Sequence, residues 1–110
     1  MMEVNARHEG SGAVIHVGGD VDLYSSPKLR EAVQDAIKRR LSPIVVDLAG
    51  VTYIDSSGVA TLVEGLQLSK EYEGKFRLIG LNERVSEVFQ LARLYQVFEV
   101  CETEAEALRN

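Results

Sequence analysis

Val45-Val46-Asp47-Leu48-Ala49-Gly50-Val51-Thr52-Tyr53-Ile54-Asp55-Ser56-Ser57-Gly58-Val59-Ala60 runs from an apolar stretch through an Asp-Ser-Ser-Gly turn into an amphipathic segment. The apolar stretch predicts a strand buried on both faces, and the stripe that begins at Val59 predicts a helix after Gly58. At a helix start, backbone N–H groups lack partners and the helix dipole favours negative charge. A phosphate on a hydroxyl of this turn would therefore be tolerated locally, and we place the candidate function there.

The rest of the chain alternates predicted strands and helices. Strands are expected at 3–8, 13–17, 44–48 and 76–81, with a short strand or extended edge at 95–101. Helices are expected from Pro27 to the closing Lys38-Arg39-Arg40, after Gly58, from Asn82 to Ala92 and from Thr103 onwards. Because strands and helices alternate, the sequence predicts an α/β fold whose parallel strands are joined by right-handed crossovers. We expect one domain over residues 1–110, a mixed β-sheet of four to five strands covered by about four helices.

Three helix starts carry capping signals. Ser25 and Ser26 precede a proline that suits the first helical turn, and Asn82 is a good cap for the third helix. Thr103 and Glu106 match a capping box, in which a hydroxyl and a carboxylate each bind a backbone N–H group.

Composition excludes several classes of function. The chain has 110 residues and a formal net charge of −5, so no basic face is expected to bind nucleic acid. It has no apolar run long enough to span a membrane and no secretory leader, and its one cysteine, Cys101, suits a reducing compartment. We therefore expect a cytoplasmic protein with no nucleic-acid or membrane partner.

The residues offer little chemistry away from the turn. His8 and His16 have no second ligand at metal-binding spacing, and Cys101 is best interpreted as a small buried apolar side chain. Glu102, Glu104 and Glu106 have the pattern of a solvated tail. A hard-metal site could join Asp20, Asp22, Asp47 and Asp55, although their spacing matches no known loop. Our expectation is no metal, no cofactor and no nucleotide site.

An isolated Asp-Ser-Ser-Gly turn could be purely structural, but a longer pattern surrounds it. The pattern comprises Gly19-Asp20-Val21-Asp22, Ser26-Pro27-Lys28-Leu29, Val46-Asp47-Leu48, Val51 to Gly58, Phe76-Arg77-Leu78 and Arg84-Val85 to Phe89. It resembles the bacterial anti-sigma factor antagonists of the STAS domain family over nearly the whole chain. The resemblance implies phosphorylation of Ser56.

The resemblance also implies a contact surface and partners. Partner contacts would involve Asp22, Asp55, Ser56, Ser57, Gly58 and Val59. The unphosphorylated protein would bind an anti-sigma factor that is also a serine kinase of the histidine-kinase-like ATPase fold, and so release a sigma factor. That kinase would phosphorylate Ser56 and end binding, and a PP2C-type serine phosphatase would restore it. One departure is that family members commonly continue Gly-Leu-Gly where this chain has Gly58-Val59-Ala60.

Two alternatives stay open at this stage. The chain could be a STAS subunit of another regulatory assembly or of a lipid transport complex, with a different partner. It could also be a small hydrolase with Ser56 as nucleophile, for which only His8 and His16 could supply the base. The resemblance favours a switch that is not an enzyme.

Overall fold

The computed structural model describes residues 2–110, which form one five-stranded sheet in the order β1-β2-β3-β4-β5. The elements are β1 (Glu3–Glu9), β2 (Gly12–Val21), α1 (Ser26–Lys38), β3 (Ile44–Ile54), α2 (Ser56–Lys70), β4 (Phe76–Ile79), α3 (Glu83–Leu91), the 3-10 turn η1 (Leu94–Gln96), β5 (Glu99–Val100) and α4 (Glu104–Ala107). β1 pairs antiparallel with β2, and the other neighbours are parallel. The predicted α/β fold and the order of its elements are confirmed.

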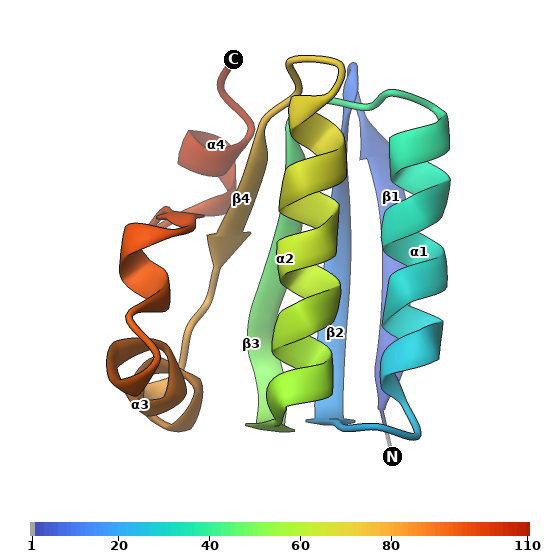
Figure 1. Ribbon diagram of the computed structural model, residues 1–110. Helices are drawn as coiled ribbons and strands as arrows, with labels where there is room; N and C mark the ends of the chain where they lie inside the picture. Colours follow the sequence, from blue (N-terminus) through green and yellow to red (C-terminus); the bar gives the residue numbers. More distant parts are fainter. Residues whose placement is uncertain (1) are drawn as a thin grey trace.

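The two faces of the sheet are covered unequally. Helices α1 and α2 lie side by side over one face, and α4 lies apart from them near the end of the sheet where the C-terminus is found (Figure 1). The main core fills the space under α1, α2 and α3 and contains alternate strand residues such as Ile15, Val46 and Leu78. A smaller apolar cluster, formed by Val14, Val45, Ile79, Cys101 and Ala107, lies on the opposite face. Successive right-handed crossovers in one direction place their helices on the same face, which explains this asymmetry.

The two central strands extend beyond the predicted bounds of 13–17 and 44–48. Their pairing continues from Gly18 opposite Gly50 to Val21 opposite Ile54. A Cβ atom added to Gly50 would lie 3.2 Å from the Cα atom of Gly18, so the glycine allows the strands to continue in close contact. Both strands therefore end at the same edge of the sheet, where α1 and α2 begin (Figure 1).

The short strand or extended edge predicted at 95–101 is confirmed only in part, as β5 at Glu99–Val100. Arg93 adopts a left-handed conformation with φ of 57°, which ends the helical run, and η1 follows. Only Glu99 and Val100 pair with β4. Cys101 is buried in the smaller apolar cluster, which confirms the interpretation of Cys101 as a small buried apolar side chain. In the described chain from Met2 onwards, every helix is too short or too polar to cross a bilayer.

Candidate functional site

Helix α2 begins three residues earlier than predicted, at Ser56 rather than after Gly58. Asp55 is the N-cap residue, with extended backbone angles, and its carboxylate accepts hydrogen bonds from the N–H groups of Ser57 (2.9 Å) and Gly58 (3.2 Å). The Asp-Ser-Ser-Gly sequence is therefore a capped first helical turn. Aspartate is a strong N-cap because its oxygen satisfies N–H groups that the helix leaves unpaired.

The two adjacent serines have different environments. The Ser57 hydroxyl donates a hydrogen bond to Asp55 Oδ1 at 2.5 Å, and Ser57 is half-buried. Ser56 is exposed, and its hydroxyl has no hydrogen-bond partner among residues 2–110. Of the two hydroxyls, only that of Ser56 is directly available to a phosphoryl donor.

Hydrogen bonds keep the Asp55 carboxylate ionised. The hydroxyl of Ser57 makes the largest contribution to lowering the pKa of Asp55, and backbone N–H groups of Gly58, Ser57 and Leu23 lower it further, against partial burial, which raises it. A carboxylate that accepts several hydrogen bonds is stabilised in its charged form. At neutral pH a negative charge therefore lies directly before Ser56.

Gly58 lets this helical turn approach the ends of both central strands. A Cβ atom at Gly58 would lie 2.7 Å from Val21 Cγ1 and 2.8 Å from Ile54 Cγ1. Ala60, which stands where the resemblance leads us to expect glycine, is exposed four residues after Ser56. Residues four apart lie on one helix face, so this departure changes the same exposed face that carries Ser56.

The loop between β2 and α1 lies against the start of α2. Asp55 N–H donates to the carbonyl of Val21 at 3.1 Å, which joins the two segments. Asp22, next in sequence, is half-buried, and its carboxylate accepts hydrogen bonds from the N–H groups of Tyr24 and Ser25, each at 3.0 Å. The structure thus brings the loop that contains Asp22 beside the Ser56 turn. The Asp22 carboxylate stabilises that loop through these two hydrogen bonds.

The capping prediction for α1 is wrong in one respect. Ser25 is its N-cap residue but makes no side-chain cap hydrogen bond. The Ser25 hydroxyl instead donates to the carbonyl of Asp20 at 2.8 Å and accepts from Asp22 N–H at 2.9 Å. The hydroxyl stabilises the loop beside the site and leaves the helix end uncapped.

Three exposed apolar residues beside the turn were not singled out from the sequence. Leu23 is 69% exposed, Tyr24 is 91% exposed and Tyr53 is 52% exposed. The backbone of Leu23 reaches the Asp55 carboxylate, and Tyr53 stands opposite Asp20 in the strand pairing. For Leu23 and Tyr24, the available signal was large apolar side chains in a loop bounded by Asp22 and Ser25. We call Leu23, Tyr24, Tyr53 and Ser56, which are exposed residues of the segments that meet where β2 and β3 end, the Ser56 surface.

The remaining carboxylates do not converge on this site. Asp47 binds His16, and Asp20 accepts a hydrogen bond from the Thr52 hydroxyl at 2.7 Å. Among residues 2–110, no three histidine, cysteine, aspartate or glutamate side chains are grouped so that they could hold a metal ion. The possible site joining Asp20, Asp22, Asp47 and Asp55 is therefore not assembled.

Neither histidine can serve Ser56 as a general base. His8 pairs with Ala13, eight residues before the end of β2, which places it about 26 Å along the strand from Val21. His16 is five residues, or about 16 Å, from Val21 and is hydrogen bonded to Asp47. A base must lie within hydrogen-bond reach of the nucleophile, so the geometry contradicts the hydrolase alternative.

Comparison with known proteins identifies the family. The family model described as "STAS domain" matches residues 3–107. The chain belongs to the STAS domain family. It is 30% identical over 93 residues to the anti-sigma-B factor antagonist of Staphylococcus epidermidis, covering 84% of this chain and 86% of that relative. The relative's name describes a regulatory protein and no catalytic activity.

Solved structures share the STAS fold. The anti-sigma factor antagonist from Mycobacterium paratuberculosis superposes with a TM-score of 0.89 at 20% identity, over 98% of this chain and 92% of that chain. The phosphorylated form of SpoIIAA, a Bacillus cell fate determinant, superposes with a TM-score of 0.74 at 21% identity, over 96% of both chains. At this identity the likeness shows the STAS fold.

Proposed function

We propose that this STAS protein is an anti-sigma factor antagonist controlled by phosphorylation of Ser56. The unphosphorylated form binds an anti-sigma factor that is also a serine kinase of the histidine-kinase-like ATPase fold, and a sigma factor is released. Phosphorylation of Ser56 by that kinase abolishes binding, and a PP2C-type serine phosphatase reverses it. The Staphylococcus epidermidis relative, named for antagonism of an anti-sigma-B factor, supports this class of partner.

The observation that carries the proposal is the difference between Ser56 and Ser57. Ser56 is exposed with an unengaged hydroxyl at the first residue of α2, whereas the Ser57 hydroxyl is bound to Asp55. A kinase can reach Ser56 without disturbing the helix cap, whereas modification of Ser57 would break the shortest hydrogen bond of that cap. The phosphorylated state of a STAS protein with the same fold, SpoIIAA, is consistent with such a modification.

Charge supplies the switching mechanism. A phosphoserine carries about −1.5 to −2 charges at neutral pH, and here it would adjoin the ionised Asp55. The helix N-terminus tolerates the added charge, so the fold need not change. At an interface, juxtaposed like charges cost several kcal/mol, and about 1.4 kcal/mol corresponds to a tenfold loss of affinity.

The apolar part of the Ser56 surface supplies attraction. Leu23, Tyr24 and Tyr53 offer aromatic and aliphatic groups of the kind that anchor protein interfaces. Asp22 holds the loop of Leu23 and Tyr24, Gly58 lets α2 approach the strand ends, and Val59 packs on the main core. In this scheme apolar contacts hold the partner. The phosphate beside them adds electrostatic repulsion of the partner, which opposes binding.

The test combines phosphorylation with binding. The protein is incubated with ATP and the serine-kinase anti-sigma factor of the same organism, and the modified site is mapped by mass spectrometry. We expect a single phosphate on Ser56, removed by a PP2C-type phosphatase. In pull-downs, Ser56→Ala should bind the kinase persistently and Ser56→Glu should not.

Ser57→Ala is the matched control, because it removes the neighbouring hydroxyl and leaves Ser56 in place. It should still be phosphorylated on Ser56 and, like the unaltered protein, lose kinase binding when it is phosphorylated. Equal binding by Ser56→Ala and Ser56→Glu, or a phosphate found on Ser57, would contradict the proposed mechanism.

A further inference from the structure

The sheet face opposite α1 and α2 is covered near one end by the C-terminal segment. Ala107 and Leu108 of this segment pack on the smaller apolar cluster, beside Val14, Val45 and Cys101. The segment contains α4, a helix of four residues whose N-cap, Thr103, accepts a hydrogen bond from Glu106 N–H at 3.1 Å. So short a helix gains little stability of its own and depends on these contacts.

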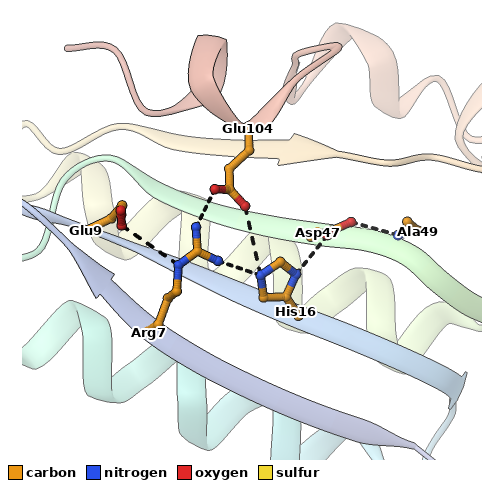
Figure 2. Close-up of polar contacts among 6 residues, drawn as sticks. All are labelled: Arg7, Glu9, His16, Asp47, Ala49 and Glu104. Carbon is orange, nitrogen blue, oxygen red and sulfur yellow. Dashed lines mark hydrogen bonds and ion pairs between the residues drawn. The ribbon is translucent and has the colours of Figure 1, made fainter.

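Glu104 joins this segment to a polar network on the sheet. Its carboxylate forms an ion pair with Arg7 of β1 and lies 3.9 Å from Nε2 of His16 in β2, as Figure 2 shows. Arg7 also donates to His16 Nε2 at 2.7 Å, and Glu9 lies 3.8 Å from Arg7. The prediction that Glu104 belongs to a solvated tail is therefore wrong.

Asp47 completes the network from β3. It lies 2.8 Å from His16 Nδ1 and also accepts a hydrogen bond from Ala49 N–H (Figure 2). Since a guanidinium can only donate, His16 Nε2 accepts from Arg7 and Nδ1 carries the proton given to Asp47. The side chains of Arg7, His16 and Glu104 are 36–41% exposed, so water competes for the contacts that Glu104 makes.

Arg77 of β4 holds the other end of the segment. Its Nη1 donates hydrogen bonds to the carbonyls of Ala107 and Arg109. Its buried Nε lies 3.0 Å from a carboxylate oxygen of Glu99, but is not aligned to make a hydrogen bond. The buried Nε of Arg77 therefore lacks a hydrogen bond within the part of the chain that the structure describes. A buried polar group without a partner costs free energy, so it weakens the packing of the segment on the sheet.

We propose that the segment Thr103–Arg109 is a detachable latch. It is held to the sheet by Glu104 at one end and Arg77 at the other, and it opens while the main core stays folded. Opening uncovers the thiol of Cys101, which is 8% exposed in the closed state. The main core lies on the opposite face under α1, α2 and α3, so it does not depend on the latch. Local openings of this kind occur where few apolar contacts hold a segment.

Cys101 reports the opening directly, because it is the only cysteine in the chain. The full-length protein is alkylated with iodoacetamide at fixed pH over a series of urea concentrations below the unfolding transition. Urea sensitivity grows with the surface exposed, so latch opening predicts an alkylation rate that is nearly independent of urea. An alkylation rate that follows global unfolding at every urea concentration would overturn the proposal.

Variants of the latch should change this rate. Glu104→Gln removes the charge that pairs with Arg7, and we expect alkylation to accelerate about two- to fivefold. Thr103→Ala removes the cap of α4 and should accelerate alkylation about fivefold. Burial is the main cause that raises the pKa of the Cys101 thiol, and the charge of Glu106 raises it further. Glu104 is therefore preferred to Glu106 for this test, because a change at Glu106 would alter the reactivity of the thiol directly.

Glu64→Gln is the matched control. It breaks the pair between Arg30 and Glu64, which joins α1 to α2 on the other face of the sheet. This variant should leave alkylation unchanged, and all three should unfold globally with the same urea dependence. If Glu104→Gln alkylates no faster than Glu64→Gln, Glu104 does not hold the latch and the proposal fails.

Discussion

At the scale of single residues, the site depends on which groups form hydrogen bonds to the Asp55 carboxylate. Asp55 binds the N–H groups of Ser57 and Gly58 and the hydroxyl of Ser57, which leaves Ser56 unengaged. The same contacts fix the orientation of the first turn and lower the pKa of Asp55. Capping and exposure of the candidate phosphorylation site thus have one physical origin.

Replacement of Asp55 tests the cap. Asp55→Ala removes the acceptor and should lower the free energy of unfolding by about 1 kcal/mol, whereas Asp55→Asn keeps an acceptor oxygen and should lose less. The measurement is urea unfolding followed by circular dichroism. If Asp55→Ala is as stable as the unaltered protein, the cap contributes nothing to the fold.

The same residue predicts a dependence on acid. The folded state lowers the pKa of Asp55, so ionised Asp55 contributes stability above the ordinary aspartate pKa. That contribution is lost as the pH falls below the ordinary aspartate pKa and through the lowered folded-state pKa. In urea unfolding between pH 7 and pH 3, Asp55→Asn should therefore lose less stability than the unaltered protein. An equal loss in both would contradict the assignment.

At the scale of elements, the fit of α2 against the strand ends depends on Gly58. Gly58→Ala would place a methyl group within 3 Å of Val21 and Ile54, which are both buried. Overpacking costs about 1–3 kcal/mol, and the better helix propensity of alanine returns up to about 1 kcal/mol. We expect a net loss of about 1–2 kcal/mol in urea unfolding. Ala60→Gly measures the propensity effect alone, since Ala60 is exposed on the same helix. A stabilised Gly58→Ala protein would show that this contact is not tight.

Most elements could be predicted from the sequence where the local pattern and the fold agree. The start of α3 at Asn82 is an example, because its side chain accepts from Val85 N–H as a cap should. β3 was predicted too short, because Gly50 and Thr52 interrupt the apolar pattern while backbone pairing with β2 continues to Ile54. Strand pairing depends on the neighbouring strand, which the local sequence does not contain.

Contacts between distant residues were beyond sequence reasoning. The Asp-Ser-Ser-Gly pattern placed the site at the start of α2, and the choice of Ser56 within it was implied by the resemblance to the STAS family. Arg7 and Glu104 are 97 residues apart, and no local pattern relates them. The strand at 95–101 was predicted from apolar content, but the left-handed Arg93 directs the chain into η1.

At the scale of the whole molecule, the two proposed devices occupy opposite ends of the sheet. The first turn of α2 lies at the lower edge in Figure 1 and α4 near the upper edge. Phosphorylation would take the formal net charge from −5 to about −6.5 to −7 without removing any contact of the core. We therefore expect Ser56→Glu to unfold at the same urea concentration as the unaltered protein, so that its loss of binding is electrostatic.

An electrostatic origin makes a prediction about salt. Exposed charges are screened over about 10 Å at 0.1 M salt and about 3 Å at 1 M, while apolar contacts by Leu23 and Tyr24 are not weakened by screening. Raising the salt concentration should therefore recover part of the kinase binding lost by Ser56→Glu and leave that of Ser56→Ala nearly unchanged. Titration calorimetry at the two salt concentrations measures both affinities. If salt changes the two affinities by the same factor, the modified residue excludes the partner by its shape, and repulsion by charge is not the switch.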